Sequence, residues 1–269
     1  MSTEPDQDAA SREDHFVRSL ERGLAVIRAF TADSPTMTLS EVARATGLTR
    51  AAARRFLLTL TDLGYVRSDG RGFALTPRVL ELGYAYLSSA SLPELAQPHL
   101  ERLATEVRES SSVSVLDGDD VVYVARVPTS RIMTVSINVG TRFPAYATSM
   151  GRVLLAGKSD PEVEAYLERA ELRRLTSRTI TSAAKLRAEL ERVRSQGWAI
   201  VDQELEEGLR SVAAPIRDSS QTVVAAANVS AHSSRAPVED LRRDLLPALL
   251  ATTARIEADL EIATRSTRA

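Results

Sequence analysis

Apolar residues recur at helical spacing through residues 39–60, LSEVARATGLTRAAARRFLLTL, in two short segments separated by a glycine. Gly47 lies four residues after Ala43 and supplies the positive φ that a tight corner between two helices needs. The pattern leaves four apolar side chains to close a small core, namely Val42, Leu48, Ala53 and Phe56. This spacing predicts a helix, a sharp corner and a second helix, the arrangement called helix-turn-helix.

The second predicted helix has an apolar face and a face rich in arginine. A period of 3.6 residues turns five side chains inward, Leu48, Ala52, Phe56, Leu57 and Leu60. The outer face then carries Thr49, Arg50, Ala51, Arg54 and Arg55, with Thr49 at the N-cap position. Guanidinium groups suit either phosphate oxygens or the O6/N7 edge of guanine, and small methyl groups suit a thymine methyl. The face is therefore typical of DNA recognition, and the sequence leaves open which arginine contacts bases.

The next twelve residues, YVRSDGRGFALT at 65–76, alternate as a short β-hairpin does. Arg67 and Arg71 lie near its predicted tip, where they would contact phosphates and carry no sequence information. Such a hairpin after the second helix is a wing. The predicted DNA contacts are Thr38, Ser40, Thr49, Arg50, Ala51, Arg54, Arg55, Arg67 and Arg71. The alternative is an unrelated helical hairpin with solvated arginines, because this pattern also gives false matches.

The charge distribution supports the first interpretation. Residues 16–80 contain ten arginines and five acidic residues, a net charge of +5, whereas the whole 269-residue chain has a net charge of −2. The positive charge is thus concentrated where the helix-turn-helix pattern lies, as a nucleic-acid footprint requires. With 43% hydrophobic and 26% charged residues, the composition is that of a globular protein, and the length predicts two domains.

Several classes of function find no support in the sequence. The chain has no cysteine, and its three histidines, His15, His99 and His232, are far apart, so no metal ligand set or thiol chemistry is predicted. No GxSxG, GxxxxGK[ST] or GxGxxG motif is present, and we predict no catalytic residue and no cofactor. The polar, acidic N-terminus and the absence of a long apolar run predict a cytoplasmic protein that does not interact with a membrane.

Along the rest of the chain the pattern predicts an α+β protein. We expect a disordered tail at 1–15, a winged helix-turn-helix domain at 16–76, a linker helix and hinge at 77–91, and a second α/β domain at 92–269. The first helix should place Leu20, Leu24 and Ile27 against the helix-turn-helix or a partner chain. In the second domain we predict strands near 112–118, 121–127 and 132–138, helices at 149–156, at 160–169 and up to Gly197, a final strand at 222–230 and a C-terminal helix.

Several segments together resemble the IclR family of bacterial transcriptional regulators. They are FVRSLERGLAVIRAF, TLSEVARATGLTRAAARRFLLTLTDLGYV, FALTPRVLELGYAYLSS, LPELAQPHLERL, SVSVLDGDDVVYVARV and TSMGRVLLA. Within the family, three segments are most similar in sequence to the branch that controls the β-ketoadipate pathway, the PcaR/PobR type. They are AAARRFLLTL, ALTPRVLELGYAYLSS and VDQELEEGLRSVAAPI. The resemblance implies a GAF-like effector-binding second domain and a homodimer or homotetramer. The two DNA-binding domains of a dimer would contact a palindromic operator whose half-sites are about 34 Å, or a multiple of about 34 Å, apart.

The resemblance also implies an effector site in the second domain. In PAYATSMGR, a cap at Thr148 or Ser149 would leave helix N–H groups of Ser149, Met150 and Gly151 directed at an anion, and a carboxylate fits there. The other positions that match the family's pocket are Asp202 or its neighbour Val201, Ser211, Asn228 and Ser230, with Phe143 and Met133 as apolar walls and Arg126 as a charge partner. The alternative is that these polar residues satisfy buried backbone and the apolar ones are core.

We therefore expect a sequence-specific, double-stranded DNA-binding regulator whose operator affinity changes with a small carboxylic acid from aromatic catabolism. One alternative is a small-molecule-binding architectural protein that binds DNA through phosphates. The other is an enzyme acting on organic acids, because the second domain is large enough for a substrate pocket. The sequence does not distinguish an activator from a repressor.

Overall fold

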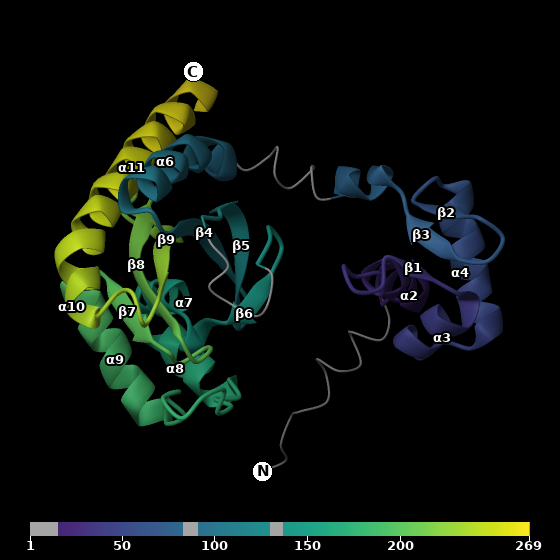
Figure 1. Cartoon of the computed structure of the whole chain (residues 1–269), viewed down its shortest axis with the longest axis horizontal. Helices are drawn as coiled ribbons and strands as arrows, with labels where there is room; N and C mark the ends of the chain where they lie inside the picture. Colours follow the sequence, from purple (N-terminus) through teal and green to yellow (C-terminus); the bar gives the residue numbers. More distant parts are fainter. Residues whose placement is uncertain (1–15, 83–90, 130–136, 269) are drawn as a thin grey trace, which may run out of the picture. The chain divides into compact units, whose positions relative to one another are not determined.

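The computed structural model describes residues 16–82, 91–129 and 137–268, and the chain divides into two compact units, Met1–Ser88 and Ser89–Ala269 (Figure 1). The expected tail at 1–15 lies outside the described residues, as do most of the expected linker helix and most of the strand at 132–138. The part of the linker region that is described is a 3-10 turn, η1 (Pro77–Val79), followed by helical residues up to Leu82.

The N-terminal unit is a winged helix-turn-helix. Its elements are α2 (Arg18–Arg28), β1 (Thr36–Met37), α3 (Leu39–Thr46), α4 (Arg50–Asp62), β2 (Val66–Ser68) and β3 (Phe73–Leu75). The strands form an antiparallel sheet in the order β1-β3-β2, and β2 with β3 is the predicted wing. Strand β1 was not predicted, since two residues carry no periodicity.

Local capping explains where α3 and α4 begin and end. Thr38 and Glu41 form a capping box at the start of α3, and Gly47 ends that helix with φ +66°. Thr49 then caps α4 by accepting a hydrogen bond from the Ala52 backbone N–H at 3.2 Å. The predicted corner and N-cap are both confirmed.

The core of this unit contains the side chains that the helical pattern turned inward. Val42, Ala53, Leu57 and Leu60 are buried, and Leu48 and Phe56 pack against them. The first helix was predicted to pack beneath the helix-turn-helix or against a partner chain. Ile27 packs on this core, whereas Leu20 and Leu24 are 62% and 47% exposed and do not pack beneath the helix-turn-helix.

The C-terminal unit is built on one antiparallel sheet of six strands, in the order β6-β5-β4-β9-β8-β7 (Figure 1). The strands are β4 (Ser110–Asp117), β5 (Asp120–Val127), β6 (Arg142–Pro144), β7 (Ala199–Asp202), β8 (Leu209–Arg217) and β9 (Val223–His232). The helices and turns are α6 (Ser91–Val107), η2 (Ala145–Ala147), α7 (Ser149–Ala156), α8 (Asp160–Arg169), α9 (Ala183–Gln196), α10 (Val238–Asp240), η3 (Leu241–Leu245) and α11 (Leu246–Arg268). Strands β4, β5 and β9 and helices α7, α8 and α9 lie where they were predicted.

Strands β6, β7 and β8 were not predicted. The β8 segment LRSVAAPIR is buried along most of its length, so it lacks the polar and apolar alternation of a strand with one wet face. Strands β6 and β7 have three and four residues, too few for periodicity to identify them.

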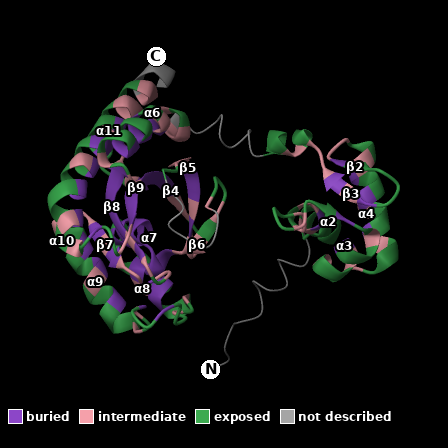
Figure 2. Cartoon of the chain, in the orientation of Figure 1, coloured by how far each residue is buried: buried purple, intermediate pink, exposed green. Residues whose placement is uncertain are grey.

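The two faces of the sheet differ in chemistry, and this difference positions the site. One face, with Val113, Val212, Ala227 and Val229, packs on α6 and α11 in a wholly apolar cluster. The other face packs on α7 and contains serines and an asparagine among small apolar residues. Figure 2 shows the central strands as the buried part of this unit, with exposed residues on the outer sides of the helices.

Candidate functional site

The outer face of α4 presents arginine to solvent. Thr49, Arg50, Ala51, Arg54 and Arg55 are all exposed, as the helical period predicts. Arg50, Arg54 and Arg55 form no ion pair with any other residue in the described part of the chain. Their charges are therefore available to an anionic partner, and their spacing of one turn along the helix suits a row of phosphates or a base edge.

Two residues predicted to contact DNA also cap the helices α3 and α4. The hydroxyl group of Thr38 donates to Glu41 Oε2 at 2.8 Å, and that of Thr49 accepts from Ala52. Ser40 is exposed in the first turn of α3. The Thr38 hydroxyl proton is used in its cap, whereas the Thr49 hydroxyl accepts in its cap and keeps its own proton for a further hydrogen bond.

Hydrogen bonds to the Asp69 side chain stabilise the turn of the wing. Asp69 accepts from the backbone N–H groups of Arg71 and Gly72 at 2.9 and 2.7 Å. These two backbone hydrogen bonds, from Gly72 first, hold the pKa of Asp69 below its ordinary value. Arg67 and Arg71 are exposed on this turn, in agreement with the prediction that they lie near the tip.

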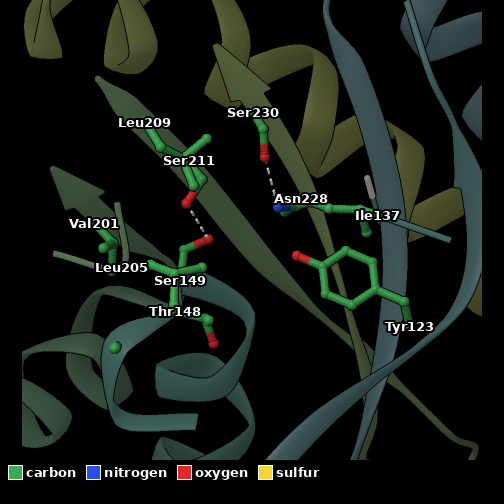
Figure 3. A pocket seen from close by; sticks show the side chains of 11 residues that line it. Tyr123, Ile137, Thr148, Ser149, Val201, Leu205, Leu209, Ser211, Asn228 and Ser230 are labelled. Carbon is green, nitrogen blue, oxygen red and sulfur yellow. Dashed lines mark hydrogen bonds between the residues drawn. The ribbon is translucent and has the colours of Figure 1, made fainter. Parts of the chain in front are cut away.

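The C-terminal unit contains a small cavity between the polar face of the sheet and the start of α7 (Figure 3). Its volume in this conformation is about 10 Å³, the room of about one water molecule. The residues that line it are Tyr123, Ile137, Ala147, Thr148, Ser149, Val201, Leu205, Leu209, Ser211, Asn228 and Ser230. Six of these were predicted from the sequence, namely Thr148, Ser149, Val201, Ser211, Asn228 and Ser230.

Polar groups from four elements meet at this cavity. Ser149 at the start of α7 donates to Ser211 on β8 at 2.8 Å, and Asn228 on β9 donates to Ser230 at 3.0 Å. The phenol group of Tyr123 points toward the space between these pairs (Figure 3). Burial raises the pKa of Tyr123 to about 12, so this hydroxyl is neutral and able to donate or accept a hydrogen bond.

A row of side chains crosses the sheet beside the cavity. Arg126, Ser112 and Asn228 are cross-strand neighbours on β5, β4 and β9 and therefore share one face. Arg126 Nη1 donates to Ser112 Oγ at 3.2 Å. Arg126 Nε and Asn228 Oδ1 are buried and have no hydrogen-bond partner among the described residues. Buried polar atoms are normally paired, so these two indicate a place where a ligand or water supplies the missing partner.

The start of α7 differs from the prediction in detail. Thr148 is the cap, and its hydroxyl accepts the Gly151 backbone N–H at 3.0 Å. That N–H is therefore not available to an anion, whereas capping leaves those of Ser149 and Met150 without a side-chain partner. Gly151 is required for close packing, because a Cβ there would lie 2.1 Å from the carbonyl oxygen of Ala145. The Met150 side chain is buried away from the cavity, where its sulfur accepts from Ser114 Oγ at 3.2 Å.

Two further predicted residues do not line the cavity. Phe143 packs edge-on against the Tyr123 ring, with the ring centroids 5.8 Å apart, and so supports the wall from behind. Asp202 forms ion pairs with Arg178 and Arg210. Partial burial acts to raise the pKa of Asp202, but hydrogen bonds from Arg210 and Gln203 and the two positive charges lower it below its ordinary value. Its neighbour Val201 occupies the cavity wall instead. Met133 lies outside the described residues.

The sequence did not identify five lining residues, namely Tyr123, Ile137, Ala147, Leu205 and Leu209. The register of β4 and β5 shifts between Val113 and Ser114, where Val124 is an extra residue on β5. Tyr123 therefore lies on the same face as Arg126 although the two are three residues apart. Leu205 and Leu209 lie in or beside the connection between β7 and β8, two strands that the sequence pattern did not reveal. The only sequence feature that could have indicated Tyr123 is that it is a tyrosine within a predicted strand rich in valine.

No group of three or more histidine or acidic side chains able to hold a metal ion occurs within residues 16–82, 91–129 and 137–268. Over the same ranges, no helix is long and apolar enough to cross a membrane. The cavity offers neutral hydrogen-bonding groups and apolar walls, with the half-buried Arg126 beside it. Such a set suits a small organic acid better than a cation.

Comparison with known proteins agrees with this description. A family model for the IclR helix-turn-helix domain matches residues 19–70, and a model for the C-terminal region of bacterial IclR transcriptional regulators matches residues 84–258. The chain is 48% identical over 239 residues to the Pca regulon regulatory protein of Pseudomonas putida, which covers 88% of this chain and 82% of that protein.

Solved structures give the same result. A transcriptional regulator from Rhodococcus sp. RHA1 has 63% identity and a TM-score of 0.83, covering 91% of this chain and 98% of the other. An IclR homologue from Microbacterium hydrocarbonoxydans, solved in complex with 4-hydroxybenzoate, has 26% identity and a TM-score of 0.78, covering 90% and 98%. The exposed arginine face, the wing, the closed cavity and these matches lead to one conclusion: the chain belongs to the IclR family of bacterial transcriptional regulators.

Proposed function

We propose that this protein binds an operator through α4 and the wing, and that a small aromatic carboxylic acid in the C-terminal cavity changes its affinity for that operator. The observation that carries the DNA-binding part is the row of exposed arginines on α4, which form no ion pair with other described residues. In this proposal α4 enters the major groove, and Arg67 and Arg71 contact the neighbouring phosphates.

The chemistry of the cavity supports an aromatic acid as effector. The carboxylate would accept the backbone N–H groups of Ser149 and Met150, where the dipole of α7 favours an anion. The ring would lie against Val201, Leu205 and Leu209. A ring substituent such as a hydroxyl would reach Tyr123 or Asn228 Oδ1, and Arg126 would add a positive charge beside it. The homologue bound to 4-hydroxybenzoate and the Pca regulatory relative support this class of ligand.

The small volume of the cavity supports a role in regulation. An aromatic acid does not fit in about 10 Å³, so its binding must separate groups that are now in contact, for example Ser149 and Ser211. The acid then has different affinities for the closed and the open conformation. Such a difference is the condition under which a ligand shifts an equilibrium and changes affinity at a second site.

The remaining expectations belong to the same proposal. The protein acts in the cytoplasm as a homodimer or homotetramer on a palindromic operator, and it does not turn over its ligand. The apolar side chains exposed on α2, Leu20 and Leu24, support contact with a second copy of the chain.

The experiment is a fluorescence anisotropy titration of the full-length chain against its own promoter fragment, with and without 4-hydroxybenzoate, protocatechuate and β-ketoadipate. At least one acid should change the operator Kd by roughly 5- to 150-fold, the usual range of coupling between two sites. Asn228→Ala should reduce that change, whereas the control Arg243→Ala, on an exposed turn outside the cavity, should not. An operator affinity that none of the acids alters would refute the effector part. Chemical conversion of an acid by the purified chain would favour the enzyme alternative.

A further inference from the structure

Arg152 is a charged residue with an almost fully buried side chain in the first turn of α7. Its side chain is 2% exposed. Nε donates to the carbonyl oxygen of Tyr146 at 3.0 Å, and Nη2 donates to Glu204 Oε2 at 2.6 Å. Arg152 does not line the cavity and has no place in the binding of DNA or effector described above.

Two partners of Arg152, Tyr146 and Glu204, lie next to residues that line the cavity. Tyr146 immediately precedes the wall residues Ala147, Thr148 and Ser149. Glu204 immediately precedes Leu205, a wall residue in the connection between β7 and β8. One buried guanidinium therefore joins the segment that offers the helix N–H groups to the segment that offers an apolar contact.

Glu204 is also bound to the loop before α9. Glu204 Oε2 also accepts the Ile180 backbone N–H at 2.9 Å, and its carbonyl oxygen accepts from Thr179 Oγ1 at 2.7 Å. Both of these partners lie in the loop before α9. The ion pair with Arg152 thus links Glu204 to α7, in addition to its contacts with the loop before α9.

The main effect of this ion pair is on geometry and not on the free energy of unfolding. A buried ion pair gives little net stability, because desolvation of both charges offsets their attraction, and apolar residues of similar size often replace such a pair without loss. A short, buried and directional pair fixes the separation of the groups it joins.

We propose that Arg152 and Glu204 are positioning residues, a buried clasp that holds Leu205 and the start of α7 at the separation needed to bind the effector. The inference rests on the proposed function, because it assigns the effector to this cavity. Neither residue touches the acid. Their loss therefore weakens acid binding while operator affinity without acid stays the same.

The test uses the full-length chain with the double substitution Arg152→Met/Glu204→Leu, which replaces both charges by apolar side chains. Glu204→Gln is the conservative variant, since its amide oxygen still accepts from Arg152. Glu189→Gln is the matched control, because Glu189 also lies near Arg152, at 3.7 Å, but belongs to α9 and not to the cavity wall. Three quantities are measured: the Kd for 4-hydroxybenzoate by calorimetry, hydrogen exchange in residues 203–208, and the operator Kd without acid.

We expect the double variant to bind the acid at least about tenfold more weakly and to exchange faster in residues 203–208, with the operator Kd unchanged. Glu204→Gln and Glu189→Gln should stay within about threefold of the wild type. Acid affinity equal to the wild type in a folded double variant, or unchanged exchange in residues 203–208, would overturn the clasp. If the double variant does not fold, equal acid affinities and equal exchange in Arg152→Lys and the wild type would overturn it as well. Absence of binding by the wild type to any aromatic acid would instead refute the proposed function.

Discussion

Arginines in the two units of this protein have opposite environments. In residues 16–82, Arg78 alone forms an ion pair with another described residue, and the arginines of α4 and the wing face solvent. In the C-terminal unit many arginines are paired with carboxylates, from exposed pairs such as Arg142 with Asp117 to the buried pair of Arg152 with Glu204. Ion pairing with carboxylates, rather than the number of arginines, therefore distinguishes a surface that can bind an external anion from one whose arginines stabilise the fold.

The distinction has a physical basis. An unpaired exposed guanidinium remains fully solvated, so it costs the fold little and keeps its charge for a phosphate. A paired arginine has already exchanged water for a carboxylate, and a second anion would have to compete with that carboxylate.

Arg152→Ala should have the largest effect on stability. It leaves the Glu204 carboxylate buried without its partner, and breaking a buried pair in this way costs about 3–5 kcal/mol. Urea unfolding of the C-terminal unit measures the loss. A loss below about 1 kcal/mol would mean that water replaces the guanidinium and that the pair is not a structural constraint.

Thr49→Ala should lower the stability of the N-terminal unit by about 0.5–2 kcal/mol, because the first turn of α4 loses its cap. Thr49→Ser keeps the hydroxyl and serves as the control. Thermal unfolding followed by circular dichroism measures both variants. Equal melting temperatures for the alanine and serine variants would show that the cap contributes nothing.

Arg67→Ala and Arg71→Ala should leave the fold intact and weaken binding to all DNA sequences alike. Each lost phosphate contact should reduce the slope of log K against log salt by about 0.9. Anisotropy titrations over a range of salt concentrations measure that slope. A loss confined to one DNA sequence would mean that the wing contacts base edges.

Arg142→Ala should have the smallest effect. Its pairs with Asp117 and Asp120 are exposed, and such pairs contribute about 0–1 kcal/mol. Neither operator affinity nor the response to acid should change. A decrease in operator affinity on this substitution would break the comparison between the two units, because it would give a paired arginine a part in DNA binding.

The sequence was sufficient where short-range rules decide the structure. Gly47, Thr49 and the periodic apolar residues determine the helix-turn-helix by local conformation and capping, and all three were predicted correctly. The cap at Thr148 and the polar positions on β9 could be predicted for the same reason, together with the family resemblance.

The sequence was not sufficient where the long-range register of strands determines the structure. The bulge in β5 brings Tyr123 into the cavity, β7 and β8 bring Leu205 and Leu209, and no local pattern encodes either. Arg152 and Glu204 are 52 residues apart, so only the fold shows that they are paired.

The most direct test of the central claim compares binding of an operator duplex and of a scrambled duplex by the wild type, Arg50→Ala and Arg54→Ala. The account predicts that the wild type prefers the operator. At least one of the two substitutions should weaken operator binding by about 1–3 kcal/mol, and it should have a much smaller effect on the scrambled duplex. Equal binding of both duplexes by the wild type, or an equal loss on both duplexes in each variant, would contradict the assignment of α4 as the element that recognises the operator sequence.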